Sequence, residues 1–293
     1  MQQDLMILDG GMGVELLKRG SGSRTELWSA QALLDAPEEV LAVHADYIAA
    51  GARMIITNSY STIPSYLGKL DMADRYLELT GLAAGLARQA ADAAAVDVLV
   101  AGSLPPLSES YRADLVPADD EASPIYESLV IALNGSVDLF LCETMSCVRE
   151  AANAAQAATQ LGGGKPVYVS WTLDETPGQG LRSGESIADA VDALAHLDVA
   201  AMLFNCTSVD AIEAGLRELR QLTAVPVGAY PNLLHIPSGW TLDDNSVPAQ
   251  YQEMTPAQFV NWAERFVAAG ATILGGCCGI GPEHISALSS RYA

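Results

Sequence analysis

The sequence predicts an α/β fold, a single (β/α)8 TIM barrel, and three observations lead to that prediction. Eight short, apolar, β-rich runs recur along the 293 residues, and segments with apolar residues at helical spacing follow them. The runs are apolar throughout instead of alternating with polar residues, which is typical of parallel strands buried on both faces. No linker or low-complexity tract divides the chain. We therefore expect residues 1–293 to form one domain, with eight parallel strands inside a ring of helices.

Helix signals lie between the predicted strands. The segments 38–50 (EEVLAVHADYIAA) and 186–197 (SIADAVDALAHL) carry apolar residues at helical spacing. The segment 255–270 adds a start signal, Thr255 before Pro256, and a stop signal, a glycine at its end. At this length and strand count, a closed barrel is favoured over an open doubly wound sheet. The predicted strands are residues 5–8, 53–58, 97–101, 137–142, 167–172, 199–205, 225–230 and 271–274.

Chemically unusual residues follow the predicted strands one after another. In a (β/α)8 barrel the active site lies at the carboxyl ends of the strands, so residues at these positions are expected to gather around one site. The residues in question are Asp9, Asn58, Ser103, Glu143, Thr172, Cys206, Tyr230 and the pair Cys277 and Cys278.

Charge and cysteine content narrow the possible partners and the compartment. The chain has 15 Lys and Arg against 36 Asp and Glu, a formal charge of −21. Such a field repels phosphate backbones and anionic lipid headgroups, so we expect no nucleic-acid partner and no membrane partner. The start, MQQDLMILDGGMG, lacks the basic flank and long apolar run of a secretory signal. Five cysteines without disulfide-framework spacing indicate a cytoplasmic protein with reduced thiols.

Two adjacent cysteines, Cys277 and Cys278, stand in the glycine-rich stretch GGCCGIGPEH at the end of the eighth predicted strand. Cys206 ends the sixth. Only the seventh strand separates them, a distance of roughly 10 Å at the usual strand spacing, so inward-leaning side chains can converge on one ion. The neighbouring glycines allow both sulfurs to face the same side.

Three explanations fit this cysteine pattern. Three thiolates without a fourth protein ligand are typical of a catalytic zinc ion, whose fourth position stays open, whereas an iron–sulfur cluster normally has four cysteines. The adjacent pair is also compatible with a redox disulfide, or with buried inert thiols. We expect Cys142 and Cys147 to pack in the core. The four histidines are expected at the surface or at helix caps rather than as ligands: His44, His196, His235 and His284.

Several motifs in order along the whole chain resemble those of the zinc-dependent homocysteine S-methyltransferases. They are LDGGMGVELLKRG, LWSAQALLDAPEEVLAVHADYIAAGARMIITNSY, GSLPP, ETM, YPN and GGCCGIGPEHI. The resemblance implies a homocysteine-binding barrel in which Cys206, Cys277 and Cys278 are the catalytic zinc ligands. It also implies that homocysteine sulfur takes the open position, and that the amino acid is held in a pocket formed by Asp9, Gly10, Gly11, Glu143 and Asn205.

The same resemblance implies methyl transfer from a cationic donor to the zinc-bound thiolate of L-homocysteine, which forms methionine. A sulfonium such as S-methylmethionine is the expected donor, since its positive charge can rest on an aromatic face. Trp28, Tyr60 and Trp171 are the candidates for that face. Relatives that use folate or betaine carry additional modules or longer extensions, which favours S-methylmethionine or S-adenosylmethionine.

The sequence departs from the family pattern after YPN, where relatives more often continue with Ser-Gly. The loop that follows contains Trp240, Asp243 and Asp244, which are expected to replace the usual donor contacts. This departure leaves other donors, and other thiol or selenol acceptors, open. A redox or zinc-sensing protein that uses the adjacent cysteines is the alternative outside this enzyme class.

Overall fold

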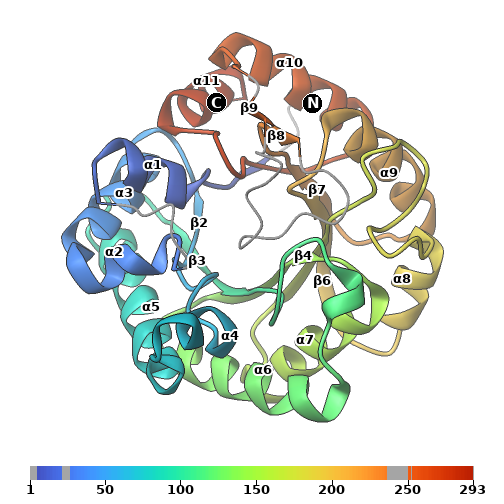
Figure 1. Cartoon of the computed structure of the whole chain (residues 1–293). Coiled ribbons are helices and arrows are strands. Elements are labelled where there is room, and N and C mark those ends of the chain that lie inside the picture. Colours follow the sequence, from blue (N-terminus) through green and yellow to red (C-terminus); the bar gives the residue numbers. More distant parts are fainter. Residues whose placement is uncertain (1–4, 22–26, 236–249, 252, 293) are drawn as a thin grey trace.

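Eight parallel strands form the barrel in the computed structural model, which describes residues 5–21, 27–235, 250, 251 and 253–292. Each of the eight predicted strands is confirmed, with boundaries that shift by up to a few residues. The strands surround a common axis in Figure 1. They are β1 (Met6–Ile7), β2 (Met54–Ile56), β3 (Leu99–Leu104), β4 (Leu139–Met145), β5 (Val167–Trp171), β6 (Val199–Asn205), β7 (Val227–Tyr230) and β10 (Ile273–Leu274).

The sheet closes on itself at the first strand. Its order is β1-β10-β7-β6-β5-β4-β3-β2, so β1 pairs with the last barrel strand. A parallel bridge between Leu8 and Met54 joins the other side of β1 to β2, and the Arg53 amide donates to the Ile7 carbonyl at 2.8 Å. Closure leaves neither edge of the described barrel sheet unpaired, which removes a common site of aggregation.

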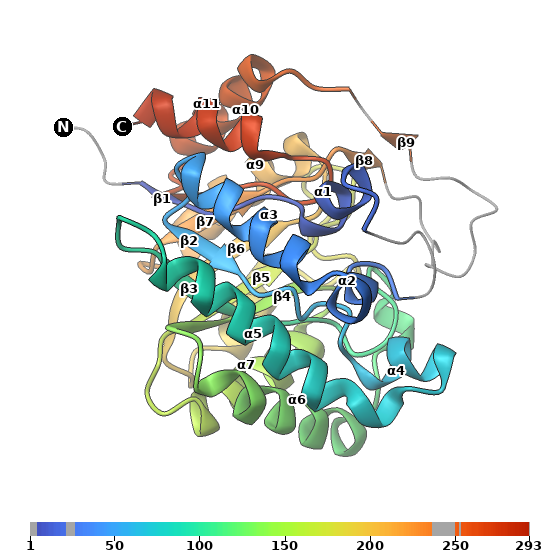
Figure 2. The ribbon, with the colours of Figure 1, turned by 90° about the vertical axis from the view of Figure 1, so that its left-hand side faces the viewer.

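Helices surround the strands, as the side view in Figure 2 shows. The three helical segments read from the sequence are confirmed as α3, α8 and α10, although α8 is shorter than expected. The helices in the described part of the chain are α1 (Met12–Lys18), α2 (Ala30–Asp35), α3 (Pro37–Ala49), α4 (Pro64–Leu67), α5 (Tyr76–Asp92), α6 (Asp119–Asn134), α7 (Val148–Leu161), α8 (Ile187–Ala193), α9 (Val209–Leu222), α10 (Pro256–Ala268) and α11 (Pro282–Tyr292). Among the described helices, none combines the length and the apolar content needed to cross a membrane.

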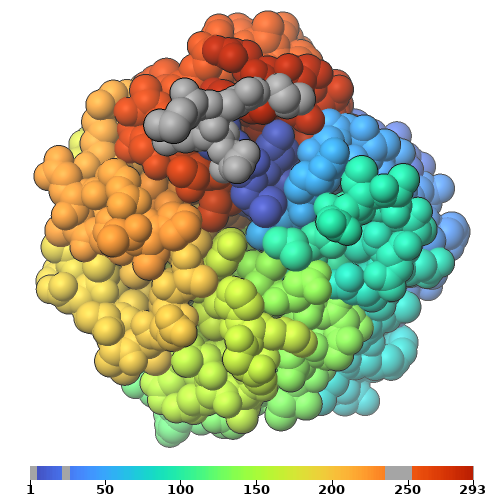
Figure 3. Space-filling model, turned by 180° about the vertical axis from the view of Figure 1, so that it is seen from behind, coloured from blue at the N-terminus to red at the C-terminus, as the bar shows by residue number. Residues whose placement is uncertain are grey.

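The chain runs once around the barrel in sequence order. From behind, the colours follow that order around the molecule, and the N-terminal blue lies beside the C-terminal red (Figure 3). This arrangement places the residues that follow β1 beside those that follow β10.

Two groups of apolar side chains form the core. The larger lies between the strands and the helices. The smaller fills the barrel interior, so the barrel is packed and any ligand must bind above it. The interior group consists of Leu8, Met54, Ala101, Leu139, Leu141, Ala201, Leu203, Tyr230 and Ile273.

The prediction for His44 is wrong, whereas His284 caps a helix as expected. His44 in α3 is fully buried, and burial lowers its pKa to about 4. His44 lies on a buried helix face, where a neutral imidazole is favoured over a charged one. His284 is buried in the first turn of α11, where its Nδ1 accepts a hydrogen bond from the amide of Gly281, the residue directly before the helix, at 3.2 Å. Neither belongs to the cysteine cluster described below.

A short antiparallel pair, not predicted from the sequence, follows β7. It joins β8 (Leu234–His235) to β9 (Gln250–Tyr251). Trp240, Asp243 and Asp244, which were expected to contact a donor, lie between them and outside the described residues.

The N-terminus of α10 is capped by the predicted start signal, and the contribution of this cap to stability can be measured. Thr255 is its N-cap: the Gln258 amide donates to Thr255 Oγ1 at 3.3 Å, and the Thr255 amide donates to Gln258 Oε1 at 2.9 Å. Thr255→Ala removes the first bond and is expected to cost about 1 kcal/mol of unfolding free energy, or about 2–4 °C in Tm. Thr255→Ser keeps the cap and should leave Tm almost unchanged. Equal losses in both variants, measured by calorimetry, would contradict the capping role.

Candidate active site

A cavity of about 470 Å³ opens at the carboxyl ends of the strands. Most of the unusual residues singled out at the strand ends line it, as the barrel rule predicts. Ser103 and Thr172 lie beneath it instead, where both are fully buried. The lining residues predicted from the strand ends are Asp9, Asn58, Glu143, Cys206, Tyr230, Cys277 and Cys278.

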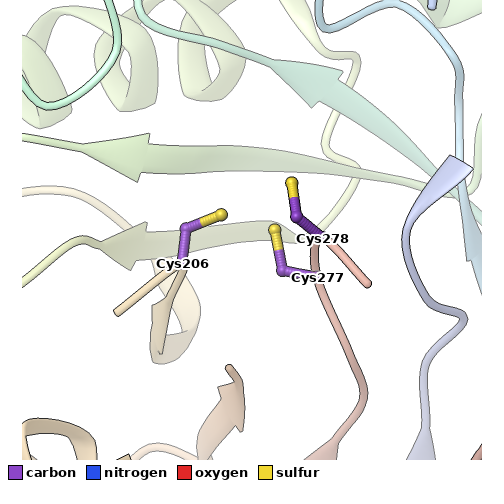
Figure 4. Close-up of side chains that lie close together, drawn as sticks. All are labelled: Cys206, Cys277 and Cys278. Carbon is purple, nitrogen blue, oxygen red and sulfur yellow. The ribbon is translucent and has the colours of Figure 1, made fainter. Parts of the chain in front are cut away.

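The structure brings Cys206, Cys277 and Cys278 together. Their three sulfur atoms all lie within 4.8 Å of one another. Cys206 is buried, whereas the other two are partly accessible from the cavity. Figure 4 shows Cys206, which comes from the end of β6, facing the adjacent pair, which comes from the segment after β10. Cys142 and Cys147 are buried away from this cluster, as expected.

Backbone hydrogen bonds fix the two segments that carry these cysteines. The Cys206 amide donates to the Tyr230 carbonyl at 3.3 Å, and the Cys277 amide donates to the Pro231 carbonyl at 2.8 Å. Both segments are therefore tied to the end of β7. Gly279 has a φ of +88°, a conformation that residues with a side chain rarely adopt, and it lets the chain turn directly after the cysteine pair.

Gly10 and Gly11 allow the β1–α1 connection to lie against the cysteine segment. A Cβ at Gly11 would stand 2.8 Å from the Cys277 carbonyl oxygen, and one at Gly10 would stand 2.2 Å from the Ile280 carbonyl oxygen. The Gly11 amide donates to that Ile280 oxygen at 3.0 Å. Both glycines also line the cavity. Close backbone approach thus explains why glycine occupies these positions.

Two buried carboxyl groups, Asp9 and Glu143, face the same cavity. Asp9 Oδ2 accepts from the Ile56 amide at 2.9 Å, while its Oδ1 is buried without a hydrogen-bond partner. Glu143 accepts from Ser103 Oγ at 2.5 Å and from the Tyr230 hydroxyl at 3.4 Å. Burial is the main cause that raises the pKa of Asp9 well above its usual range and the pKa of Glu143 to about 7. A bound cation would favour the ionised form of both groups.

Aromatic rings form much of the remaining wall, and the described lining residues include no Lys, Arg or His. Trp28 and Tyr60 line the cavity as expected, together with Tyr66, Tyr111 and Tyr230. The cavity therefore presents carboxyl groups, sulfur atoms and aromatic rings, a combination suited to a cationic ligand.

Two residues expected at the site lie elsewhere. Trp171 is fully buried and packs against Phe204 in the layer between strands and helices, with ring centroids 6.4 Å apart. Asn205 does not line the cavity, because its side chain is fully buried beneath it. Asn205 Oδ1 accepts from the Thr144 amide at 3.0 Å and from Ser170 Oγ at 2.7 Å. Its Nδ2 donates to Thr144 Oγ1 at 2.8 Å.

Strained backbone marks four residues of the cavity, two of which the sequence did not single out. Five described residues other than glycine have a positive φ, and four of them line the cavity: Trp28 (48°), Tyr111 (68°), Thr144 (60°) and Cys206 (52°). Such conformations cost on the order of 1–3 kcal/mol each and gather at functional sites. Tyr111 was missed because it lies in no motif that indicates chemistry, and Thr144 lies in the ETM motif but was given no role.

Comparison with known proteins agrees with this geometry. The family model described as homocysteine S-methyltransferase matches residues 6–292. The homocysteine S-methyltransferase of Escherichia coli (strain K12) is 32% identical, over 99% of this chain and 96% of that protein. Homocysteine S-methyltransferase YbgG of Bacillus subtilis (strain 168) is 29% identical, over 98% of this chain and 94% of that protein.

A solved structure has the same fold. The metallated form of the homocysteine methyltransferase MmuM from Escherichia coli superposes with a TM-score of 0.83 at 31% identity, and covers 99% of this chain and 97% of that one. The likeness therefore extends over the whole barrel and is not limited to the cysteine motif. The chain belongs to the homocysteine S-methyltransferase family.

Proposed function

We propose that this protein transfers a methyl group from a sulfonium donor, S-methylmethionine in the first place, to the sulfur of L-homocysteine and so forms methionine. The observation that carries the proposal is the convergence of three cysteine sulfurs and two buried carboxyl groups in one cavity. The sulfurs suit a metal that binds a thiol, and the carboxyl groups suit the ammonium group of an amino acid. A cytoplasmic location, where thiols stay reduced, fits this chemistry and stays a prediction.

Zinc fits the donor set of Cys206, Cys277 and Cys278. Tetrahedral zinc with Zn–S bonds of about 2.3 Å places its sulfur ligands about 3.8 Å apart, within the 4.8 Å that contains these sulfurs. Among the described residues, no fourth Cys, His, Asp or Glu belongs to the cluster. Three protein ligands with one open position are typical of catalytic zinc. When bound there, zinc would act as a Lewis acid that keeps the acceptor thiol deprotonated at neutral pH.

Asp9 and Glu143 are the proposed partners of the homocysteine ammonium group. Asp9 Oδ1 lacks a hydrogen-bond partner although it is buried, and an ammonium group would supply one. Glu143 is oriented by Ser103 and Tyr230, which limits its motion. Gly10 and Gly11 directly follow Asp9 and line the same cavity. These contacts would orient the amino acid so that its sulfur faces the cysteine cluster.

The charge and the rings of the cavity support a cationic donor. Trp28 and Tyr60 offer aromatic faces to a sulfonium, and no described lining residue carries a positive charge. In the transfer, the acceptor sulfur forms the new bond to the methyl carbon, and the electron pair of the broken bond stays on the donor sulfur. The donor thus leaves as a neutral thioether. The cavity would lower the barrier mainly by aligning acceptor, methyl and leaving group.

The direct test is methyl transfer to deuterated L-homocysteine, because methionine made from it differs in mass from methionine left by the donor. We expect labelled methionine from zinc-loaded protein with S-methylmethionine, and less or none with a neutral donor. Absence of product with every sulfonium tested would refute the proposal. Labelled product from other thiols or selenols, at equal rates, would indicate a broader acceptor range.

The metal part of the proposal is tested separately by zinc content under reducing conditions. Wild-type protein is expected to hold about one zinc per chain, and Cys278→Ser to lose most of it. Cys147→Ser is the matched control, since Cys147 caps α7 and lies outside the cluster, so its zinc content should not change. Metal-free wild type that loses two thiols on mild oxidation would favour redox chemistry instead.

Glu143→Gln should separate binding from stability in metal-free protein. Burial raises the pKa of Glu143 from 4.5 to about 7, so the folded state favours the protonated carboxyl group. This preference contributes its full share to the unfolding free energy below pH 4.5, and the contribution is lost as pH rises through about 7. The variant should therefore exceed wild type at pH 8, by on the order of 3 kcal/mol in unfolding free energy, with a smaller gap at pH 5. It should also bind homocysteine more weakly.

Glu150→Gln is the control for that experiment. Burial also raises the pKa of Glu150 to about 7, but Glu150 lies outside the cavity lining. The stability of Glu150→Gln relative to wild type should change with pH in the same way as that of Glu143→Gln, while homocysteine binding is unaffected. Urea unfolding at both pH values and calorimetric titration with homocysteine provide the two readouts. Unchanged homocysteine binding in Glu143→Gln would contradict the ammonium contact.

A further inference from the structure

Tyr47 in α3 reaches the junction between the first and last barrel strands. Its side chain is fully buried, and its hydroxyl donates a hydrogen bond to the Ile280 carbonyl at 2.9 Å. The same hydroxyl lies 3.3 Å from the Gly11 carbonyl, close enough to share its proton between the two oxygens. Gly11 belongs to the β1–α1 connection, and Ile280 lies two residues after Cys278. One hydroxyl thus joins the segment that follows Asp9 to the segment that contains the cysteine pair.

The junction is packed closely around this hydroxyl. The Ile280 carbonyl also accepts from the Gly11 amide at 3.0 Å, so two donors meet at one oxygen. A Cβ at Gly10 would stand 2.9 Å from the Tyr47 hydroxyl oxygen and 2.9 Å from the neighbouring ring carbon Cε1. Contacts this short leave no room for a side chain, so the Tyr47 ring is a second reason for glycine at this position. Because α3 packs against both α1 and α11, the ring is held between the two segments that it joins.

The joined segments carry the groups proposed to hold the two ends of homocysteine. Asp9 is the proposed partner of the ammonium group, and Cys277 and Cys278 belong to the cluster that would hold the acceptor sulfur through the metal. The separation of these groups determines how long an amino acid must be to reach both. Cysteine has one methylene fewer than homocysteine between its sulfur and its α-carbon, so it is too short for a site spaced for homocysteine. A single methylene changes binding by about 10–200-fold in a well-fitted site.

We propose that Tyr47 is a positioning residue that sets the length of the acceptor, because its hydroxyl fixes the separation between Asp9 and the cysteine pair and so favours homocysteine over shorter thiols. The inference rests on the proposed function, in which Asp9 and the metal hold opposite ends of the acceptor. Tyr47 is not among the described residues that line the cavity, so it acts through the carbonyl oxygens of Gly11 and Ile280. Removal of its hydroxyl should change which acceptor binds best while the groups that contact the acceptor stay present.

Tyr47→Phe is the central test, because it removes the hydroxyl and keeps the buried ring. Homocysteine and cysteine are titrated calorimetrically into zinc-loaded full-length protein, and zinc content is measured so that all preparations are compared at equal loading. Wild type should bind homocysteine about 10–200-fold more tightly than cysteine. In Tyr47→Phe this ratio should fall about fivefold, the effect of one typical hydrogen bond, mainly through weaker binding of homocysteine.

Tyr126→Phe is the matched control. Tyr126 in α6 is also buried, and its hydroxyl donates to the Pro105 carbonyl at 3.0 Å. The variant therefore loses the same kind of hydrogen bond, from a residue that is not among the described residues lining the cavity. Both variants should show a similar decrease in Tm, but Tyr126→Phe should keep the wild-type ratio of affinities. The Tm thus measures the structural cost, and the ratio measures the positioning role.

The outcomes separate this inference from the proposed function. A ratio equal to wild type in Tyr47→Phe would overturn the inference, and so would an equal fall of the ratio in Tyr126→Phe. Should Tyr47→Phe misfold by circular dichroism, Gly10→Ala decides, since its Cβ would push against the Tyr47 hydroxyl and the Ile280 carbonyl. An unchanged ratio in Gly10→Ala then overturns the inference.

Wild-type behaviour completes the test. Wild type that methylates homocysteine but binds both thiols equally overturns this inference alone. Wild type that shows the expected ratio but transfers no methyl group from any sulfonium overturns the proposed function alone. Wild type that binds neither thiol overturns both.

Discussion

Closure of the barrel at β1 is the constraint on which the site depends. Parallel pairing of β1 with β10 places Asp9 and the two following glycines beside the cysteine pair, more than 260 residues away in the sequence. The Gly276 amide donates to the Asp9 carbonyl at 2.9 Å, so the carboxyl group and the sulfurs are fixed by one hydrogen-bonded junction. The end of β7 fixes the remaining sulfur through the Tyr230 carbonyl. The geometry of the cluster is therefore a property of the closed barrel, and a flexible loop alone would not maintain it.

That geometry concentrates groups that prefer not to be ionised together. Burial and mutual repulsion raise the pKa of Asp9, and Glu143 carries a raised pKa for the same main reason. Unliganded, such a cavity opposes folding, because ionised groups lose hydration without gaining a partner. A bound metal ion and a cationic ligand would supply those partners, so the same groups would then favour the folded state. The overall charge of −21 has the same sign as the cavity, so long-range attraction and local contacts favour the same class of ligand.

The sequence was sufficient for the strands and for the residues at their ends, because the barrel rule needs only strand order. The sequence was insufficient for deciding whether a strand residue faces the barrel interior or the surrounding helices. Trp171 and its neighbour Phe204 point outward to the helices, whereas Tyr168 and Leu203 point into the barrel. A shift of one residue exchanges these faces, and an apolar strand carries no alternation that would fix it. Tyr111 was beyond sequence reasoning for another reason, because its position results from loop conformation.

Asn205 shows how a residue can serve a site without touching its contents. Its amide group satisfies the Thr144 amide and hydroxyl and accepts from Ser170, so all three bonds are used within the protein. Thr144 has a strained backbone and directly follows Glu143. Because strained conformations persist only when their surroundings fix them, Asn205 stabilises the turn that aims Glu143 into the cavity. Glu143, which lines the cavity, is thus held in place by a lower layer of buried polar groups to which Asn205 belongs.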